Sequence, residues 1–476
     1  YDVVVTNPPY MGASNMNSDL SEYVKKYYPD SKSDLFAVFI EVCSRMAKQN
    51  GYQAMITQHA WMFLASFEKL REKMMLTETV SMAHLGARAF EEIGGEVVQT
   101  TSFVRVRTHI DNFKGVYCRL IEPTTQQDKE EMFLAGENRY TANQDNFAKI
   151  PGSPVAYWAS KNEIDVFANN SKIDDLFETR NGMSTTNNNL FLRFWFECPL
   201  NECGLGNYTA ITAQKSKKRW FRYNKGGEFR RWYGNNDYVV NWKDNGAELK
   251  KYVADRYGSY SKEIRSEDRY FFESITWSGV TSSATGFRYS PQGAVFDSGA
   301  NGLFAKNSKL LMYLLGFLNT KITIELVKFK NPTINTGSGT VGKLPIDIEE
   351  SKIDSVNENV RECIKLSETD WDSFETSWDF TRHPFIKAIT KYPNMMDVGN
   401  IYLAECYDIW AGECEERFEK LKANEEELNR IFIDIYGLQD ELTPEVEDKD
   451  VTVRKADLSR DVRSFISYAV GCMFGR

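Results

Sequence analysis

YDVVVTNPPY, residues 1–10, decides the fold, because an apolar run changes there into a proline-stiffened turn. Residues 3–6 are β-branched and predict a short strand. Proline fixes φ and cannot donate a backbone hydrogen bond, so Pro8 and Pro9 end the strand in a rigid extended turn. Ligands of open α/β sheets bind beyond the carboxyl ends of strands. The turn at residues 7–10 is therefore the first candidate site.

Strand and helix signals continue to alternate up to residue 110. Apolar side chains recur at helical spacing over residues 33–49, and Asn50-Gly51 ends that helix. Strands separated by helices indicate an α/β layered sheet. The remaining elements expected here are strands at 52–57, 80–85 and 97–107 and a helix at 66–76.

The chain of 476 residues is too long for one ordinary domain. A break at Pro151-Gly152-Ser153-Pro154 follows a polar stretch, and short aromatic and β-branched runs then predict a β-rich region. Beyond Leu344-Pro345 the sequence becomes acidic and its pattern predicts helices. The expected divisions are an α/β part at 1–110, a connector at 111–150, an α+β, β-rich domain at 151–345 and a helical region at 346–476.

Composition excludes several classes of function. The longest apolar runs are far shorter than the ~20 residues that cross a bilayer, so no membrane partner is expected. Four histidines without ligand spacing argue against a metal site. Eight scattered cysteines match no zinc motif and suggest reduced thiols, which favours a cytoplasmic location.

Positive charge is concentrated locally although the net charge is −9. Residues 215–233 hold eight basic residues and one acid, Glu228, interleaved with aromatic side chains. Such a mixture suits contacts with phosphates and bases, whereas the alternative is a solvated basic loop. The candidate DNA-binding residues are Lys215, Lys217, Lys218, Arg219, Arg222, Arg230 and Arg231, together with Arg288 in a later aromatic run.

The tetrapeptide Asn7-Pro8-Pro9-Tyr10 resembles the catalytic loop of amino-methyltransferases, and its flanking strands and helix resemble successive motifs of that class. The exocyclic nitrogen of adenine is a poor nucleophile because its lone pair is conjugated with the ring. The resemblance implies that the Asn7 side-chain oxygen and the Pro8 carbonyl accept the two N6 hydrogens and orient the amine. Asn at the first position points to adenine, because cytosine-N4 enzymes usually carry Ser.

The same resemblance implies base flipping, since the amino group of a paired adenine lies inside the duplex. Pro9 completes the rigid loop, Tyr10 would stack on the extruded base, and Phe90 is the candidate for its other face. A packing role for Phe90 is the alternative. His59 and Trp61 are expected to pack or cap and are left out of the catalytic set.

Over the whole chain the sequence resembles the BREX phage-defence adenine-specific DNA methyltransferases of the PglX type, in the gamma order of N6-adenine enzymes. Segments 274–279 and 287–293 resemble target-recognition domains. The implied fold is the C-terminal half of a Rossmann-like methyltransferase sheet, followed by a β-rich target-recognition domain and a helical region. The implied partners are double-stranded DNA and other phage-defence proteins.

The implied cofactor is S-adenosyl-L-methionine. The glycine-rich turn that this family places before the catalytic loop is not found, so we expect Asn7 and Pro8 only to border the cofactor and the chain alone to be inactive. A glycine-rich P-loop spacing at 337–343 lacks the following Ser or Thr and is set aside. Two alternatives remain: a combined restriction-modification enzyme, and a DNA-specificity scaffold without activity of its own.

Overall fold

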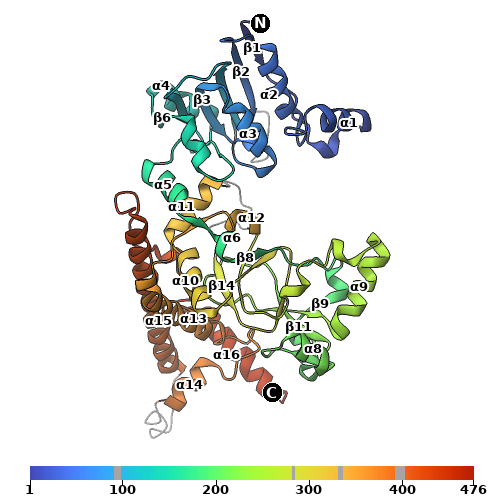
Figure 1. Cartoon of the computed structure of the whole chain (residues 1–476). Helices are drawn as coiled ribbons and strands as arrows, with labels where there is room; N and C mark the ends of the chain where they lie inside the picture. The colour runs from blue at the N-terminus through green and yellow to red at the C-terminus, as the bar shows by residue number, and fades with distance from the viewer. Residues whose placement is uncertain (91–97, 281–284, 331–335, 392–402, 476) are drawn as a thin grey trace. The chain divides into compact units, whose positions relative to one another are not determined.

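The computed structural model describes residues 1–90, 98–280, 285–330, 336–391 and 403–475, and the chain divides into two compact units (Figure 1). The first comprises Tyr1–Asn170 with Lys328–Pro332, and the second comprises Ser171–Val327 with Thr333–Arg476. The division at residue 170 lies beyond the boundary expected near residue 150.

A six-stranded mixed sheet forms the first unit, in the order β1-β2-β4-β3-β5-β6. Strand β1 pairs with β2 in parallel, with Val3 beside Tyr52, whereas β4 runs antiparallel to β2 and β3. The carboxyl ends of β1, β2, β3 and β5 therefore lie at one end of the sheet. The strands are β1 (Val3–Thr6), β2 (Tyr52–Gln58), β3 (Glu78–Gly86), β4 (Thr100–Val106), β5 (Gly115–Arg119) and β6 (Arg139–Ala142).

Two helices contribute to the core of this unit. Helix α2 (Leu35–Met46) begins at the N-cap Asp34 and buries Phe36 and Ile40 in the cluster that also holds Leu70 of α3 (Glu68–Met74). Strand β2 alternates buried and partly exposed residues, as a strand with one covered face should. The remaining helices of the unit are α1 (Ser18–Tyr27), α4 (Gln126–Ala135) and α5 (Lys161–Asn169).

The stretch predicted as a connector, residues 111–150, contributes two strands to this sheet. Strand β5 pairs in parallel with β3, and β6 pairs with β5. The sequence of β5 does not alternate apolar and polar residues as a half-buried strand should, because Tyr117 and Cys118, neighbours in sequence, are both buried. Strand β4 lies within the predicted 97–107, of which residue 97 is outside the described residues.

Short strands fill much of the second unit, as the aromatic and β-branched runs predicted. One sheet has the order β10-β11-β12-β9 with β15 paired to β11, another has the order β14-β13-β16-β8, and β17 pairs with β7. These strands are β7 (Ser171–Lys172), β8 (Glu178–Arg180), β9 (Leu192–Phe194), β10 (Cys203–Gly204), β11 (Trp220–Asn224), β12 (Tyr238–Asn241), β13 (Ser274–Ser278), β14 (Phe287–Ser290), β15 (Ala294–Phe296), β16 (Ala300–Phe304) and β17 (Pro345–Ile346).

Helices dominate the second unit after residue 346. The apolar helix α10 (Ser308–Leu318) packs against α13 (Ile353–Trp371), and α13 packs against the 34-residue α15 (Leu403–Tyr436). Two further helices follow residue 346, α14 (Pro384–Lys391) and α16 (Leu458–Met473). Other helices lie among the strands before that residue: α6 (Ile173–Leu176), α7 (Asn188–Phe191), α8 (Ala210–Ser216), α9 (Lys243–Tyr257) and α12 (Ser338–Val341).

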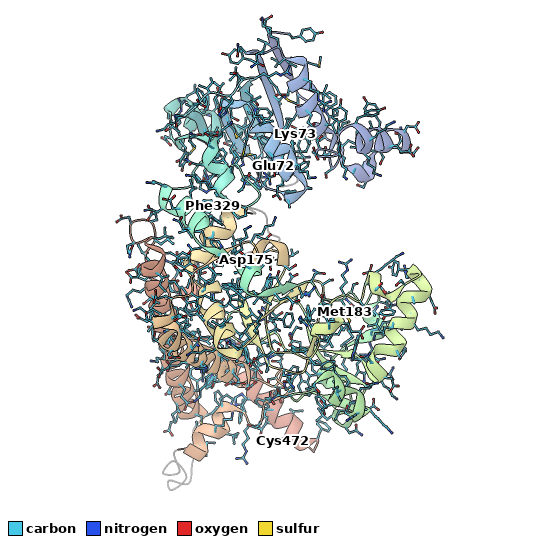
Figure 2. The ribbon with its side chains drawn as sticks, in the orientation of Figure 1. Glu72, Lys73, Asp175, Met183, Phe329 and Cys472 are labelled. Atoms are coloured by element: carbon cyan, nitrogen blue, oxygen red, sulfur yellow. The ribbon has the colours of Figure 1, made fainter. Side chains whose placement is uncertain are left out.

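Helix α11 (Lys321–Lys330) begins in the second unit, and its residues from Lys328 onward belong to the first. Within the first unit, Phe329, which is labelled in Figure 2, stacks on Trp158 with ring centroids 6.0 Å apart. Within the described ranges, no single helix has the length and apolar character needed to cross a bilayer, although α10 and α11, bent by 74°, meet both criteria as a pair.

Candidate functional site

The Asn-Pro-Pro-Tyr loop leaves β1 at the carboxyl end of that strand. Thr6, its last residue, pairs with Met55 in the middle of β2. The side chain of Asn7 is exposed, Pro8 is buried and Pro9 is exposed. The buried proline anchors the loop while the neighbouring amide faces solvent, so Asn7 can present an oxygen acceptor from a rigid support.

Asp34 fixes the far end of the loop. Its Oδ1 accepts from the backbone N–H of Met11 at 3.0 Å and of Phe36 at 3.3 Å, and the Leu35 N–H donates to the Met11 carbonyl at 3.0 Å. One carboxylate thus caps α2 and holds the chain that follows Tyr10. Burial raises the pKa of Asp34. The sequence signal for this positioning residue was an Asp directly before the apolar helical run.

Tyr10 is half-buried between the loop and the core. Its ring meets Phe36 edge-on, with ring centroids 6.1 Å apart. Its hydroxyl is buried and has no hydrogen-bond partner among the described residues. The ring is therefore fixed by apolar packing, and its hydroxyl adds no restraint.

Two other predicted groups follow strands that end on the same side of the sheet. Phe90 is half-buried in the bend after β3, four residues beyond the last residue of that strand. His59 directly follows β2, and its Nδ1 lies 2.8 Å from His84 Nε2, whose Nδ1 lies 3.0 Å from the Tyr157 hydroxyl. Burial lowers the pKa of His59 to about 4 and that of His84 well below its usual value.

This chain of buried rings is a feature that sequence reasoning missed. Its members come from the turn directly after β2, from β3 and from a loop near residue 157, so only the folded sheet brings them together. Both imidazoles are neutral at pH 7 because their folded pKa values lie below it. The expectation that His59 packs is met, since it is 8% exposed and contacts Phe63 edge-on.

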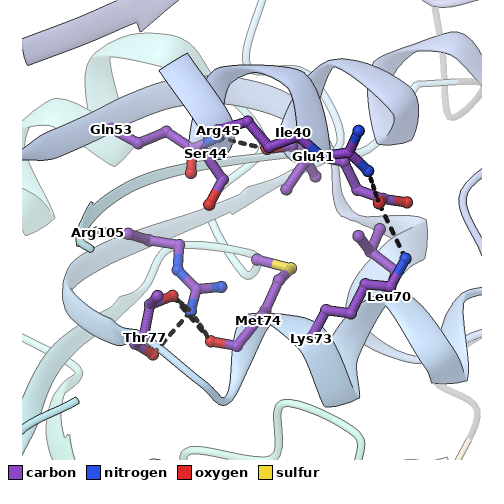
Figure 3. Close-up of a pocket in the computed structure, with 10 residues that line it drawn as sticks. All are labelled: Ile40, Glu41, Ser44, Arg45, Gln53, Leu70, Lys73, Met74, Thr77 and Arg105. Atoms are coloured by element: carbon purple, nitrogen blue, oxygen red, sulfur yellow. Dashed lines mark hydrogen bonds and ion pairs between the residues drawn. The ribbon is translucent and has the colours of Figure 1, made fainter. Parts of the chain in front are cut away.

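A cavity of 160 Å³ lies between α2 and α3 (Figure 3). Glu41 accepts from Ser31 at 2.7 Å and from Lys73 at 3.0 Å, and Arg105 donates to the Thr77 carbonyl at 2.8 Å. Burial lowers the pKa of Arg105 to about 10. Arg105 pairs with Gln53 near the start of β2, so this cavity lies toward the opposite end of the sheet from Asn7.

Four of the predicted DNA-binding residues lie around the end of α8 and the start of β11. Lys215 and Lys217 are exposed, and Lys217 ends α8 in a left-handed conformation with φ 56°. Lys218 donates to the Cys203 carbonyl at 2.7 Å, and Arg219 lies 3.5 Å from Glu248. All four are at least partly accessible, and they lie within five consecutive positions of the sequence.

The other four predicted DNA-binding residues are buried, and this corrects the expectation that they reach DNA. Arg230 donates to Asp370 at 3.0 Å, and Arg231 donates to Glu425 at 3.1 Å. The Oδ2 of Asp370 also accepts a hydrogen bond from the Nε of Arg454 at 3.1 Å. These guanidinium groups join the loop after β11 to α13 and α15, because a buried charge needs an ionic partner.

Arg222 and Arg288 are equally enclosed. Arg222 is 7% exposed and donates to the carbonyls of Pro291, at 3.1 Å, and Gln292. Arg288 is 2% exposed, and burial lowers its pKa to about 10. Interleaved Arg and aromatic residues signalled a DNA surface, but the same pattern serves a core in which guanidinium groups pair with carboxylates and carbonyls.

No group of three or more His, Cys, Asp and Glu side chains suited to a metal ion is found in the part of the chain that the structure describes. The chemistry available at residues 7–10 is that of hydrogen-bond acceptors on a rigid loop. Asn7 supplies an amide oxygen, and the prolines supply carbonyl oxygens with restricted geometry.

Comparison with known proteins finds similarity to methyltransferases. Residues 1–86 match the Eco57I restriction-modification methylase family. The whole chain is 45% identical to "Adenine-specific methyltransferase PglX" of Lacticaseibacillus casei (strain Zhang), covering 39% of that protein. It is 35% identical to "Adenine-specific methyltransferase BrxX" of Escherichia coli O9:H4 (strain HS), covering 38%.

A solved structure shares the fold. The Type IIL restriction-modification enzyme MmeI, solved in complex with DNA, matches 98% of this chain and 57% of its own, with a TM-score of 0.55 at 13% identity. The chain spans about two fifths of the length of the two curated relatives. Over its full length, this chain is similar to two proteins named as adenine-specific methyltransferases, PglX and BrxX.

Proposed function

We propose that this chain supplies the catalytic loop and the DNA-reading part of a site-specific DNA adenine-N6 methyltransferase of a BREX phage-defence system. The observation that carries the proposal is the exposed Asn7 beside the buried Pro8, at the carboxyl end of β1. In this proposal residues 1–110 belong to the second half of a Rossmann-like methyltransferase sheet, and the second unit holds the target-recognition domain and the helical region.

The loop acts on the target amine through acceptors. The Asn7 Oδ1 and the Pro8 carbonyl each accept one N6 hydrogen, which turns the nitrogen lone pair out of conjugation and toward the electrophile. Pro8 is suited to this because its burial and fixed φ keep its carbonyl in place. General-base removal of an N6 proton before the transfer is not required, since the methylated nitrogen is cationic and acidic and releases one of its two protons to solvent to give N6-methyladenine.

S-adenosyl-L-methionine would supply the methyl group as an electrophile. The donor set fits its reacting end, because Asn7 and Pro8 offer uncharged oxygens at the open end of the sheet. No residue of this chain is assigned to its amino-acid or ribose groups. Asn7 and Pro8 are therefore proposed to border the cofactor.

Tyr10 and Phe90 are proposed to enclose the extruded base. Tyr10 is half-buried and its ring packs edge-on against Phe36, so the ring is held in one orientation for stacking. Phe90 follows β3 on the same side of the sheet and is half-buried. The rigid Pro9 separates Tyr10 from the acceptors.

Duplex DNA is the proposed macromolecular partner. Lys215, Lys217, Lys218 and Arg219 are proposed to contact phosphates, since these accessible cations lie close together in sequence at the end of one helix. The relation to PglX and BrxX supports a place beside other phage-defence proteins.

Replacement of Asn7 tests the catalytic part of the proposal. In the complete protein, Asn7→Ala should lower transfer of the methyl group to duplex DNA about 100-fold or more, because one transition-state acceptor is lost. N6-methyladenine is measured by mass spectrometry of digested DNA, and DNA affinity by gel shift.

Asn15→Ala is the matched control, since Asn15 is also exposed and follows the loop on the same segment. It should leave both activity and affinity unchanged. Full methylation by Asn7→Ala would contradict the proposed role of the loop. DNA binding by the wild-type protein with no methylation under any condition would favour the specificity scaffold.

A further inference from the structure

A cavity of 720 Å³ in the second unit lies along one end of the β14-β13-β16-β8 sheet. Ser274 pairs with Ser290, and Phe304 pairs with Glu178, so the chain enters or leaves all four strands at this end. We call this cavity the sheet-end groove. Figure 2 labels Asp175, one of its lining residues.

A strained backbone places an aromatic side chain on the groove. Phe271 has a φ of 68°, in the left-handed region that aromatic residues rarely adopt, and its own side chain is 3% exposed. The next side chain, Phe272, lines the groove and is 56% exposed. Such strain costs energy and persists where the surrounding structure imposes it, often at binding sites. The fold therefore holds an aromatic ring in solvent.

Hydrogen bonds fasten this wall of the groove. The Phe271 N–H donates to the Ala294 carbonyl at 2.8 Å, and the Gly293 N–H donates to the Phe271 carbonyl at 3.2 Å. The buried Arg222 guanidinium holds the Pro291 and Gln292 carbonyls. Gln292 thus projects from a loop whose backbone is fixed on both sides.

The carboxylates in the groove already have partners. Arg269 donates to Glu178 at 2.7 Å, the Tyr289 hydroxyl donates to Glu273 at 3.1 Å, and Asp175 accepts from the Lys172 N–H at 2.9 Å. For the side chains of Asn207, Gln292 and Lys306, by contrast, the described residues provide no hydrogen-bond or ionic partner.

The groove therefore has hydrogen-bond donors and acceptors without partners in the described part of the chain, beside the exposed ring of Phe272. A track for phosphates needs only cations, whereas base edges present mixed donor and acceptor patterns that amide side chains match in pairs. The apolar face of Phe272 suits a base ring or a thymine methyl group.

From this arrangement we infer that the sheet-end groove reads base edges of duplex DNA, with Gln292 and Asn207 as sequence-reading residues and Phe272 as an apolar base contact. The inference rests on the proposed function and names residues that decide which adenine is selected. Lys306 would hold the adjoining phosphate.

Selection from a randomised duplex library tests the inference. The complete protein is incubated with the library, and bound duplexes are sequenced, a readout that needs no methylation. In Gln292→Ala and Asn207→Ala, discrimination at one or more positions of the site should fall by about 5- to 150-fold, the range expected for loss of a bidentate base contact. Phe272→Ala should weaken binding to the selected site and leave binding to unrelated duplexes unchanged.

Matched controls are Phe196→Ala, at a phenylalanine 60% exposed elsewhere in the unit, and Gln439→Ala, at an exposed glutamine beyond α15. Neither should alter the selected sequence. Circular dichroism and thermal melting check that each variant is folded. An unchanged selected sequence in folded Gln292→Ala, Asn207→Ala and Phe272→Ala overturns the inference, as does a change confined to binding of free mononucleotides.

The outcomes separate the groove from the proposed function. If the wild-type protein methylates its site and the groove variants select the same sequence, the groove inference fails and the methyltransferase proposal stands. If the groove variants alter the selected site while the wild-type protein methylates no DNA, the groove inference stands and the methyltransferase proposal fails.

Discussion

At the residue scale, neighbouring side chains in the first unit face opposite environments. Asn7 is exposed and Pro8 is buried, so the loop has one side fixed in the protein and one side open to a ligand. Asp34 reinforces this by bonding the loop exit and the first turn of α2 together. A loop held at both ends can keep its acceptors in place without a ligand.

The His59–His84 pair predicts a pH-dependent stability of the first unit. The folded pKa of His59 is about 4 and that of His84 is also lowered by burial, against an ordinary value of 6.5. Between these pH values the unfolded chain binds more protons, so the free energy of unfolding falls as pH drops from about 6.5. For His59 we expect a loss of roughly 2 kcal/mol between pH 7 and pH 5, and His84 should add a loss in the same direction.

Urea unfolding at pH 7 and pH 5 measures this loss, and His59→Gln should reduce it because the amide does not titrate. His109→Gln provides the control, since His109 is 44% exposed and lies outside the pair. An equal pH dependence in wild-type protein and His59→Gln would show that the pair does not titrate as expected.

At the element scale, buried ion pairs attach the loop after β11 to the C-terminal helices. Asp370 on α13 is fully buried and accepts from Arg230 and Arg454. Asp370→Asn removes the charge that compensates both guanidinium groups and should lower the free energy of unfolding by about 3–5 kcal/mol. Urea unfolding followed by tryptophan fluorescence measures the change.

The exposed pair Lys449–Glu447, 2.7 Å apart, is the control for that variant. Glu447→Gln should leave the unfolding midpoint where it is, because solvent screens exposed pairs. A midpoint for Asp370→Asn equal to that of the wild-type protein would mean that the buried cluster contributes little to stability.

The end of α8 carries a separate prediction about DNA. Each lysine that contacts a phosphate adds about 0.9 to the slope of log affinity against log salt concentration. Replacing both Lys215 and Lys217 by Ala should therefore reduce that slope by about 2 for duplexes of any sequence. Fluorescence anisotropy over a salt series gives the slope.

Lys352→Ala, at an exposed lysine beside α13, should leave the salt slope unchanged. A slope that stays the same in the double variant would remove α8 from the DNA surface. The buried Arg230 and Arg231 are expected to affect stability first, so they are unsuitable for this test.

At the scale of the whole molecule, the chain forms two units with separate cores. The first is built on one mixed sheet, and the second on several short sheets and a helical cluster. We expect two calorimetric unfolding transitions, because units with their own cores can unfold independently. Asp370→Asn should lower the midpoint of one transition and leave the other unchanged.

Limited proteolysis assigns the transitions, since fragments that survive between them can be identified by mass. A single transition that Asp370→Asn shifts as a whole would indicate that the two units unfold cooperatively. In that case the division at residue 170 would have no thermodynamic counterpart.

Local patterning was sufficient for the regular elements. The strand before Asn7, the helix after Asp34, and the strands at β2 and β3 lie where β-branched runs and helical spacing predicted them. The acidic stretch after residue 346 was also predicted to be helical, and α13 to α16 occupy it. These features depend on neighbours in sequence, so sequence reasoning can find them.

Long-range packing decided the rest. Whether an arginine faces DNA or a carboxylate depends on partners such as Asp370 and Glu425, which lie more than a hundred residues away. The sheet-end groove likewise needs four strand ends and the left-handed Phe271 in one place. A basic, aromatic segment has the same local chemistry in a core or on a surface, and burial alone separates the two.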